Sequence, residues 1–168
     1  MGPIMSSALA SGILSGLWAL VGGLLSAKYP ELFATWLGFV GLTSYFAAGT
    51  GKTNLVRSIS SNLVGILIGC TIIFLSTGKG NTVGAIITGI FSWLIVYLAH
   101  VDITRYAFCT FMGGYSAFAT GGNWKMLVIC IVLGNIIGHL CVVLGDFFYE
   151  KFGDKTKKDW VILKIFKD

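Results

Sequence analysis

Charged residues are scarce in this chain: aspartate, glutamate, lysine and arginine together make up 11% of its 168 residues. A soluble domain of this length needs roughly a quarter of its residues charged to cover its surface. Hydrophobic residues reach 55%, and the mean hydropathy is +0.84. The composition therefore excludes a soluble globular fold and predicts that the lipid bilayer is the chain's main partner.

Residues that commonly act in catalysis or bind metal ions are also few. The only two histidines, His100 and His139, are expected on different helices, and no hydrophobic stretch holds a pair of carboxylates. The four cysteines lack the spacing of metal ligands and form no disulfide framework, so we expect them to pack as small apolar residues. The sequence thus predicts no enzyme, no metal site and no cofactor. The cysteines are Cys70, Cys109, Cys130 and Cys141.

Hydrophobic stretches of spanning or near-spanning length account for most of the chain, since a bilayer crossing needs about 20 residues. They predict an all-α, polytopic membrane protein with six transmembrane helices. The second, fourth and fifth stretches are short, which leaves open whether they are tilted, extended by polar turns, or broken. The stretches lie at 5–27, 32–49, 55–76, 82–99, 104–120 and 125–147.

Basic residues favour one orientation in the membrane. The net charge is +5, and half of the twelve lysines and arginines follow position 150. With the N-terminus in the cytoplasm, the predicted inner segments carry nine basic residues and the outer segments three. The positive-inside rule then places both termini in the cytoplasm. Residues 148–168 become a basic cytoplasmic tail, and nucleic acid is not an expected partner.

Two segments about 72 residues apart are nearly the same. Residues 39–49 read Phe-Val-Gly-Leu-Thr-Ser-Tyr-Phe-Ala-Ala-Gly, and residues 111–121 read Phe-Met-Gly-Gly-Tyr-Ser-Ala-Phe-Ala-Thr-Gly. Each half of the chain, 5–76 and 82–147, holds three hydrophobic stretches. Because three is odd, the second copy enters the bilayer in the opposite orientation. We therefore predict one transmembrane domain, 1–147, made of two inverted three-helix repeats, an organisation typical of transporters and channels.

Polar residues inside these stretches are the candidates for a solute pathway, because an unsatisfied polar group is costly in lipid. Ser44 and Ser116 are equivalent in the two repeats, and Tyr45 follows the first of them. Asn135 and His139 share one face of the last helix. Each residue also has a structural alternative, since serine bonds back to its own helix and asparagine or neutral histidine bonds a neighbouring one.

Glycine is abundant, with 23 residues. Small residues let helix backbones approach each other closely, which supplies packing contacts in lipid. Glycines at 49–51 and 121–122 also permit the second and fifth helices to end early, so that their ends face either a solute or an ordinary turn. The glycines predicted to pack helices are Gly12, Gly16, Gly65, Gly69, Gly134 and Gly138.

Three parts of the sequence resemble a known family. They read Ser-Gly-Ile-Leu-Ser-Gly-Leu-Trp at 11–18, Trp-Leu-Gly-Phe-Val-Gly at 36–41, and Gly-Asn-Trp-Lys at 122–125. The chain is similar over roughly residues 8–145 to the bacterial inner-membrane family of unknown function that includes the enterobacterial protein YcdZ. The resemblance implies a multi-span protein of the bacterial inner (plasma) membrane and supplies no catalytic or binding residues.

These features predict a membrane channel or facilitator for transport of a small-molecule solute. Because charge within the hydrophobic stretches is scarce, a neutral or weakly ionising solute fits best, such as a short organic acid or an amide. Six helices enclose little volume, so a homo-oligomer is expected. The alternative is a non-transporting membrane scaffold or regulatory partner that acts through its basic tail.

Overall fold

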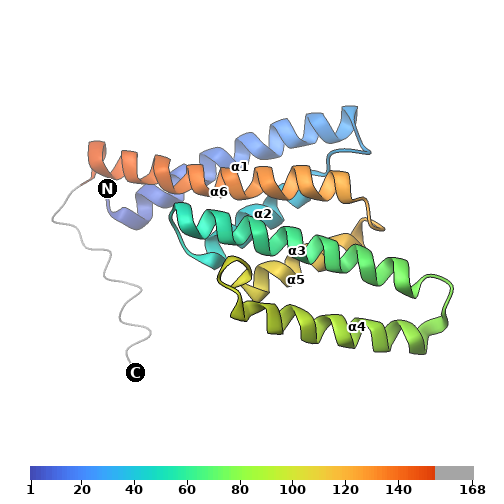
Figure 1. The fold of residues 1–168 in the computed structure, drawn as a ribbon. Coiled ribbons are helices and arrows are strands. Elements are labelled where there is room, and N and C mark those ends of the chain that lie inside the picture. The colour runs from blue at the N-terminus through green and yellow to red at the C-terminus, as the bar shows by residue number, and fades with distance from the viewer. Residues whose placement is uncertain (154–168) are drawn as a thin grey trace, which may run out of the picture.

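The computed structural model describes residues 1–153, which form helices and connecting loops without a strand (Figure 1). The predicted all-helical class is confirmed, and the predicted helix ends lie within three residues of the observed ones except at the end of the last helix. Two 3-10 turns, Leu98–His100 and Asp102–Thr104, connect the fourth and fifth helices. The helices are α1 (Pro3–Lys28), α2 (Thr35–Ala48), α3 (Lys52–Ser76), α4 (Gly80–Tyr97), α5 (Ala107–Ala119) and α6 (Trp124–Phe152).

The helices fall into two length classes. By length and composition, α1, α3, α6 and the segment Gly80–His100 that contains α4 are each able to cross a membrane. In contrast, α2 has 14 residues and α5 has 13, so they rise only about 21 Å and 20 Å. The hydrocarbon core of a bilayer is about 30 Å thick. The prediction of six spans stays a prediction, because α2 and α5 reach across only if the adjoining loops contribute.

Glycine ends both short helices. Gly49, after α2, has φ +89°, and Gly121 and Gly122, after α5, have φ +62° and +84°. Side chains other than hydrogen are strained in this left-handed region, whereas glycine adopts it readily. The chain therefore reverses within a few residues, and the long helices α3 and α6 begin at Lys52 and Trp124.

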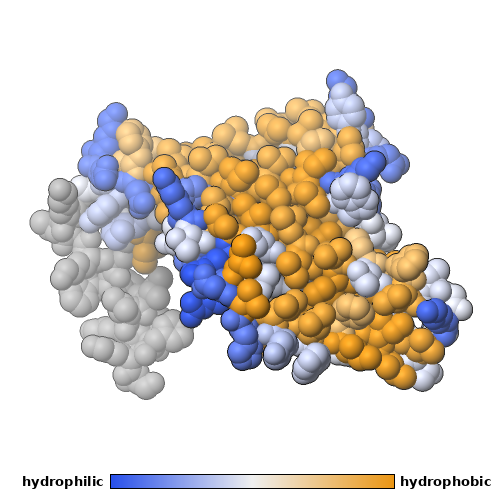
Figure 2. All heavy atoms as spheres, viewed as in Figure 1, coloured by the Kyte–Doolittle hydropathy of each residue, from blue (hydrophilic) through white to orange (hydrophobic). Residues whose placement is uncertain are grey.

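The surface of the molecule is apolar in its middle. Figure 2 shows hydrophobic residues covering the centre of the visible face and hydrophilic residues gathered at the two ends. Large side chains on the long helices are exposed, among them Leu24, Leu67, Phe74 and Trp93. A soluble protein rarely exposes a continuous apolar surface of this size. The exposed surface therefore suits contact with lipid tails.

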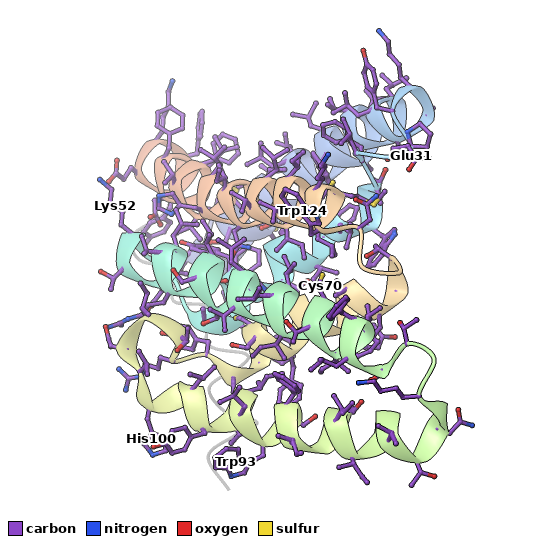
Figure 3. The ribbon with its side chains drawn as sticks, turned by 45° about the vertical axis from the view of Figure 1, so that its right-hand side comes forward. Glu31, Lys52, Cys70, Trp93, His100 and Trp124 are labelled. Atoms are coloured by element: carbon purple, nitrogen blue, oxygen red, sulfur yellow. The ribbon has the colours of Figure 1, made fainter. Side chains whose placement is uncertain are left out.

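Both described ends of the chain lie at the same end of the molecule. The N-terminal amino group of Met1 is 3.4 Å from the carbonyl oxygen of Phe152. Figure 3 shows Lys52 at this end and Glu31 at the opposite one. The last helix extends five residues beyond the predicted transmembrane domain, and the rest of the predicted tail, from residue 154, lies outside the described residues.

Backbone contacts hold α2 against α6. A Cβ atom added to Gly134 would overlap the carbonyl oxygen of Gly38, and one added to Gly41 would overlap that of Ile131. Neither helix has space for a side chain at these points. In lipid, close approach of this kind supplies the packing contacts that hydrophobic burial supplies in water.

The contact between α5 and α3 matches the one just described. A Cβ atom on Gly65 would overlap the carbonyl oxygen of Thr110, and one on Gly113 would overlap that of Asn62. On the short helices, Thr110 corresponds to Gly38, 72 residues earlier. On the long helices, Gly134 corresponds to Gly65, 69 residues earlier. The two short helices therefore meet the two long ones through equivalent atoms.

Of the other four glycines predicted to pack helices, two lie against a neighbouring helix and two do not. A Cβ atom on Gly138 would lie 2.9 Å from the ring of Tyr45, and one on Gly69 would lie 2.7 Å from Gly114. Around Gly12 and Gly16 no atom lies within 4 Å of the added Cβ, and both residues are exposed. These two glycines are directed away from the helices described.

The two kinds of glycine position predict different responses to one added methyl group. We expect Gly134→Ala to lower the free energy of unfolding by about 2 kcal/mol or more, because the methyl group forces α2 away from α6. The measurement is unfolding of the purified protein by SDS titration in detergent micelles, followed by tryptophan fluorescence.

The matched control is Gly12→Ala, which makes the same change on the free face of α1. It is expected to leave the stability unchanged or to raise it slightly, since alanine favours helix over glycine. Equal losses for the two variants would contradict the backbone contact.

Candidate functional site

Five buried side chains with polar atoms meet where α2, α3, α5 and α6 cross. Each is fully buried, with no exposed surface. We call this group the crossing cluster. It takes one residue from α2, two from α3, one from α5 and one from α6. Its members are Ser44, Ser58, Asn62, Cys109 and Asn135.

Asn62 is the centre of the cluster and bonds to three other helices. Its Nδ2 donates to Ser44 Oγ at 3.0 Å and to the carbonyl oxygen of Cys109 at 2.8 Å. Its Oδ1 accepts a hydrogen bond from Asn135 Nδ2 at 3.0 Å. Both amide protons and the carbonyl oxygen of this side chain are therefore used. The burial of a polar amide is offset by a full set of hydrogen bonds.

Asn135 is satisfied in the same way. Its second amide proton goes to the carbonyl oxygen of Ile131, one turn earlier in α6, at 2.9 Å. Its Oδ1 accepts a hydrogen bond from the hydroxyl of Ser58. The thiol of Cys109 in turn donates to the carbonyl oxygen of Ser44 at 3.3 Å. The crossing cluster is a connected network, and such networks stabilise a unique arrangement when every member is paired.

A second polar contact lies one residue further along α2. The hydroxyl of Tyr45 is 3.1 Å from Nδ1 of His139 on α6, and it accepts the backbone N–H of Gly51 at 3.0 Å. In the neutral tautomer protonated at Nε2, Nδ1 accepts the tyrosine proton. Tyr45 is fully buried. This pair thus joins α2, α6 and the turn that precedes α3.

On the other side of the crossing cluster the helices meet through apolar side chains. These residues lie toward the end of the molecule that carries Glu31, since they sit early in α2 and α6 and later in α3 and α5. They form one buried group, which we call the apolar seal. None of its side chains is more than 3% exposed. Its members are Leu37, Ile66, Ala117, Leu127, Cys130 and Ile131.

The structure divides the five predicted pathway residues into three sets. Ser44 and Asn135 belong to the crossing cluster, while Tyr45 and His139 form the second contact. Ser116 is fully buried, and its hydroxyl has no hydrogen-bond partner within residues 1–153. The sequence equivalence of Ser44 and Ser116 therefore does not extend to their hydrogen bonds.

The predicted pathway residues do not include Ser58, Asn62 or Cys109 of the crossing cluster, although the sequence indicated that Asn62 could bridge helices. Ser58, Asn62 and Gly65 recur at steps of four and three residues, the spacing of one helix face. This spacing could have identified Ser58 and Asn62, because polar residues on the same helix face as a packing glycine indicate a contact with another helix. Cys109 gave no comparable signal, and its thiol joins the network through contacts from two other helices.

Equivalent asparagines anchor the loops that lead into the short helices. Asn54 accepts a hydrogen bond from the hydroxyl of Tyr106, just before α5, at 2.7 Å. Asn123 donates to the carbonyl oxygen of Glu31, just before α2, at 2.8 Å, and its side chain also caps α6. Each asparagine lies at the start of a long helix, and its side chain is hydrogen-bonded to the loop that precedes a short helix.

An ion pair ties α3 to the turns between α4 and α5. The guanidinium of Arg57 donates to both carboxylate oxygens of Asp102. This pairing with Arg57 lowers the pKa of Asp102 from its ordinary value of 3.8. Within residues 1–153, no group of three or more His, Cys, Asp or Glu side chains is placed to hold a metal ion.

Four helices of spanning length, an apolar surface and an interior of uncharged polar groups define an integral membrane protein of the all-α class. Residues 8–146 match the family described as "Protein of unknown function (DUF1097)", and the chain belongs to this family. The resemblance noted in the sequence motifs is confirmed.

Relatives in enteric bacteria cover most of this chain. "Inner membrane protein YcdZ" of Escherichia coli (strain K12) is 34% identical over 145 residues, 83% of each chain. The protein of the same name from Salmonella typhimurium is 32% identical, over 83% of this chain and 85% of its own. "Uncharacterized protein YahC" of Escherichia coli (strain K12) is 28% identical over 94% of this chain and 98% of its own. No solved structure matches the chain.

The asparagine contact predicts an energetic coupling between α3 and α6. We expect Asn62→Ala and Asn135→Ala each to destabilise the protein, because each leaves a buried partner without its hydrogen bond. The double variant is expected to lose about 1 kcal/mol less than the sum of the single losses. A double-mutant cycle of SDS unfolding measures this difference.

Thr71→Ala provides the control for that cycle. The hydroxyl of Thr71 is exposed and bonds only to Leu67 of its own helix among the bonds described. Its effect is expected to be small and additive with that of Asn135→Ala. Additivity of the two asparagine variants would contradict the coupling.

The ion pair predicts a pH dependence of stability. A carboxylate whose pKa is lowered by folding stabilises the folded state above its unfolded pKa and loses that contribution as the pH falls through its folded pKa. Asp102→Asn is therefore expected to lower the melting temperature at neutral pH, and the gap to the unaltered protein is expected to shrink between about pH 5 and pH 3. Thermal melts in detergent across this range measure the gap, and a gap that grows toward acid pH would contradict the pairing.

Proposed function

We propose that the protein is a channel or facilitator that carries a small neutral or weakly ionising solute across the bacterial inner membrane. The pathway would pass between two inverted three-helix repeats, 5–76 and 82–147. The observation that carries the proposal is the crossing cluster, a set of uncharged polar side chains buried where four helices from both halves meet.

Three features support the inverted repeat. The order long, short, long occurs twice along the chain. The glycine contacts of α2 with α6 correspond atom for atom to those of α5 with α3. Asn54 and Asn123 anchor equivalent loops. Transporters built in this way place their solute sites at the interface of the repeats, near the middle of the bilayer, beside interrupted helices.

The chemistry of the interface favours an uncharged solute. Amide and hydroxyl groups donate and accept hydrogen bonds, so the crossing cluster suits a solute that does both, such as an amide or a protonated short organic acid. The cluster and the Tyr45–His139 pair contain no carboxylate and no lysine or arginine. A strong ion would therefore enter without a counter-charge, at a large desolvation cost.

The arrangement described corresponds to a closed conformation in this proposal. The apolar seal blocks the half of the interface nearer Glu31, and the crossing cluster satisfies its own hydrogen bonds. Passage requires the asparagines to exchange their mutual bonds for bonds to the solute. It also requires the helices that carry the seal to separate.

Orientation and assembly complete the proposal. The start of α1 and the end of α6 lie together, and the distribution of basic residues supports a cytoplasmic location for both. In the most apolar part of the α4 segment only 6% of residues are buried, compared with 44% in α3. A spanning segment with so few internal contacts supports a homo-oligomer, in which a neighbouring copy covers part of that surface.

The proposal predicts that thinning the apolar seal raises flux. We expect Ile131→Ala to increase the entry of urea, glycerol or formic acid into proteoliposomes severalfold, because the truncation opens a cavity in the seal. Asn135→Leu is expected to reduce flux, since it removes the amide from the crossing cluster. Stopped-flow light scattering on liposomes with equal protein content measures both effects.

Ile136→Ala is the matched control, because Ile136 lies on the exposed face of the same helix. It is expected to leave permeability unchanged. Permeability of the unaltered protein equal to that of empty liposomes, for each of these solutes, would contradict transport. That result would favour the scaffold that acts through residues 148–168.

A further inference from the structure

An apolar groove runs between α3, α4 and α5, with a volume of about 340 Å³. Three hydroxyl-bearing residues, Thr88, Ser92 and Tyr115, also border it. The aromatic side chains along α5 are partly exposed, so the groove is accessible from the lipid-facing surface. Its main apolar lining is Ile68, Ile72, Ile95, Phe108, Phe111 and Phe118.

The corresponding position between α1 and α2 is filled. There the indole of Trp18 lies against Gly38 and Gly22, is almost fully buried, and donates from Nε1 to the carbonyl oxygen of Thr35 at 2.9 Å. Two glycines leave space for the ring, so α1 and α2 pack closely. The tryptophan thus occupies the space between the first two helices.

The second half of the chain carries different residues at these positions. Ser-Gly-Leu-Trp at 15–18 aligns with Thr-Gly-Ile-Phe at 88–91, 73 residues later, so Phe91 corresponds to Trp18 and Ile95 to Gly22. Thr110, 72 residues after Gly38, corresponds to that glycine. Ile95 and Thr110 are buried, so α4 and α5 have no pair of glycines at these positions against which a large ring could lie. Phe91 packs instead on the apolar group of Ile68, Ile72 and Ile95. The residues around the groove therefore differ from those around Trp18.

A cationic residue precedes the helix whose first turn borders the groove. Arg105 precedes α5 by two residues, and Phe108, one turn further on, lines the groove. Asp102 is hydrogen-bonded to Arg57 and forms a longer ion pair with Arg105, at 3.9 Å. The side chain of Arg105 is 61% exposed, so its guanidinium is accessible to a second anion. The stacked rings of Trp93 and Tyr97 lie near the same end of α4. Aromatic rings and arginine at the end of a spanning segment are typical of the headgroup layer.

We propose that this groove binds an anionic phospholipid, with one acyl chain along α5 and the phosphate at Arg105. The groove is too small for a helix of a second copy, because a helix with its side chains is about 10 Å wide. A single acyl chain fits a narrow apolar channel that faces lipid. The exposed guanidinium selects a headgroup with net negative charge. This inference depends on the membrane location and not on solute transport.

Native mass spectrometry of the full chain tests the proposal. The protein is delipidated in detergent and then mixed with phosphatidylglycerol or phosphatidylethanolamine that carry the same acyl chains. We expect phosphatidylglycerol to be retained about fivefold more, the effect of one basic residue near an anionic headgroup. Arg105→Gln is expected to remove this preference, and Lys79→Gln, at the other end of α4, is expected to keep it.

Filling the groove tests the acyl-chain half of the proposal. Ser92→Trp and Thr88→Trp both place an indole in the groove, and each is expected to lower phosphatidylglycerol retention by about tenfold through loss of apolar contact. Ile86→Trp, on an exposed position of α4 that does not line the groove, is the matched control and is expected to retain lipid. Either groove variant suffices if the other fails to fold.

Two results would overturn the proposal. One is equal retention of phosphatidylglycerol by the groove variants and the Ile86→Trp control. The other is a change of oligomer mass in the groove variants without loss of lipid, which would assign the groove to a side chain of a second copy. Flux measurements on the same variants are independent of both results, so failure of the lipid site and failure of solute transport are distinguished.

Discussion

Backbone-to-backbone contact at glycine determines this structure. In lipid, helices gain no hydrophobic energy by associating, so α2 and α5 are held mainly by close approach to α6 and α3. Gly134 and Gly65 provide that approach, each against a carbonyl oxygen of a short helix. A larger residue at either position would separate the helices and expose the hydrogen-bonding groups between them.

The polar interior depends on the same contacts. Asn62 lies three residues before Gly65 on α3, and Asn135 directly follows Gly134 on α6. Because the glycines bring the backbones together, these amides reach one another and the hydroxyl of Ser44. Leaving an amide at this depth without a hydrogen-bond partner is costly. The uncharged network buried at the crossing therefore links all four helices.

The two halves share their contacts but differ in their side chains. Trp18 fills the space beside α2, while isoleucine, threonine and phenylalanine at the corresponding positions leave a groove beside α5. The polar groups are divided unequally as well, because the position that corresponds to Asn62 in the second half is Ile131. Corresponding positions in the two halves therefore carry a polar side chain in one half and an apolar one in the other.

The sequence by itself determined the membrane class, the six helices and nearly all of their ends, because hydropathy and glycine placement act locally along the chain. Only the tertiary structure decided which polar residues meet. Ser44 and Ser116 occupy the same place in two similar segments, yet only the hydroxyl of Ser44 finds an amide opposite it. A hydrogen bond requires a partner on another helix within about 3 Å. The distance between residues on different helices is set by how the glycines let those helices approach, and no local pattern contains that information.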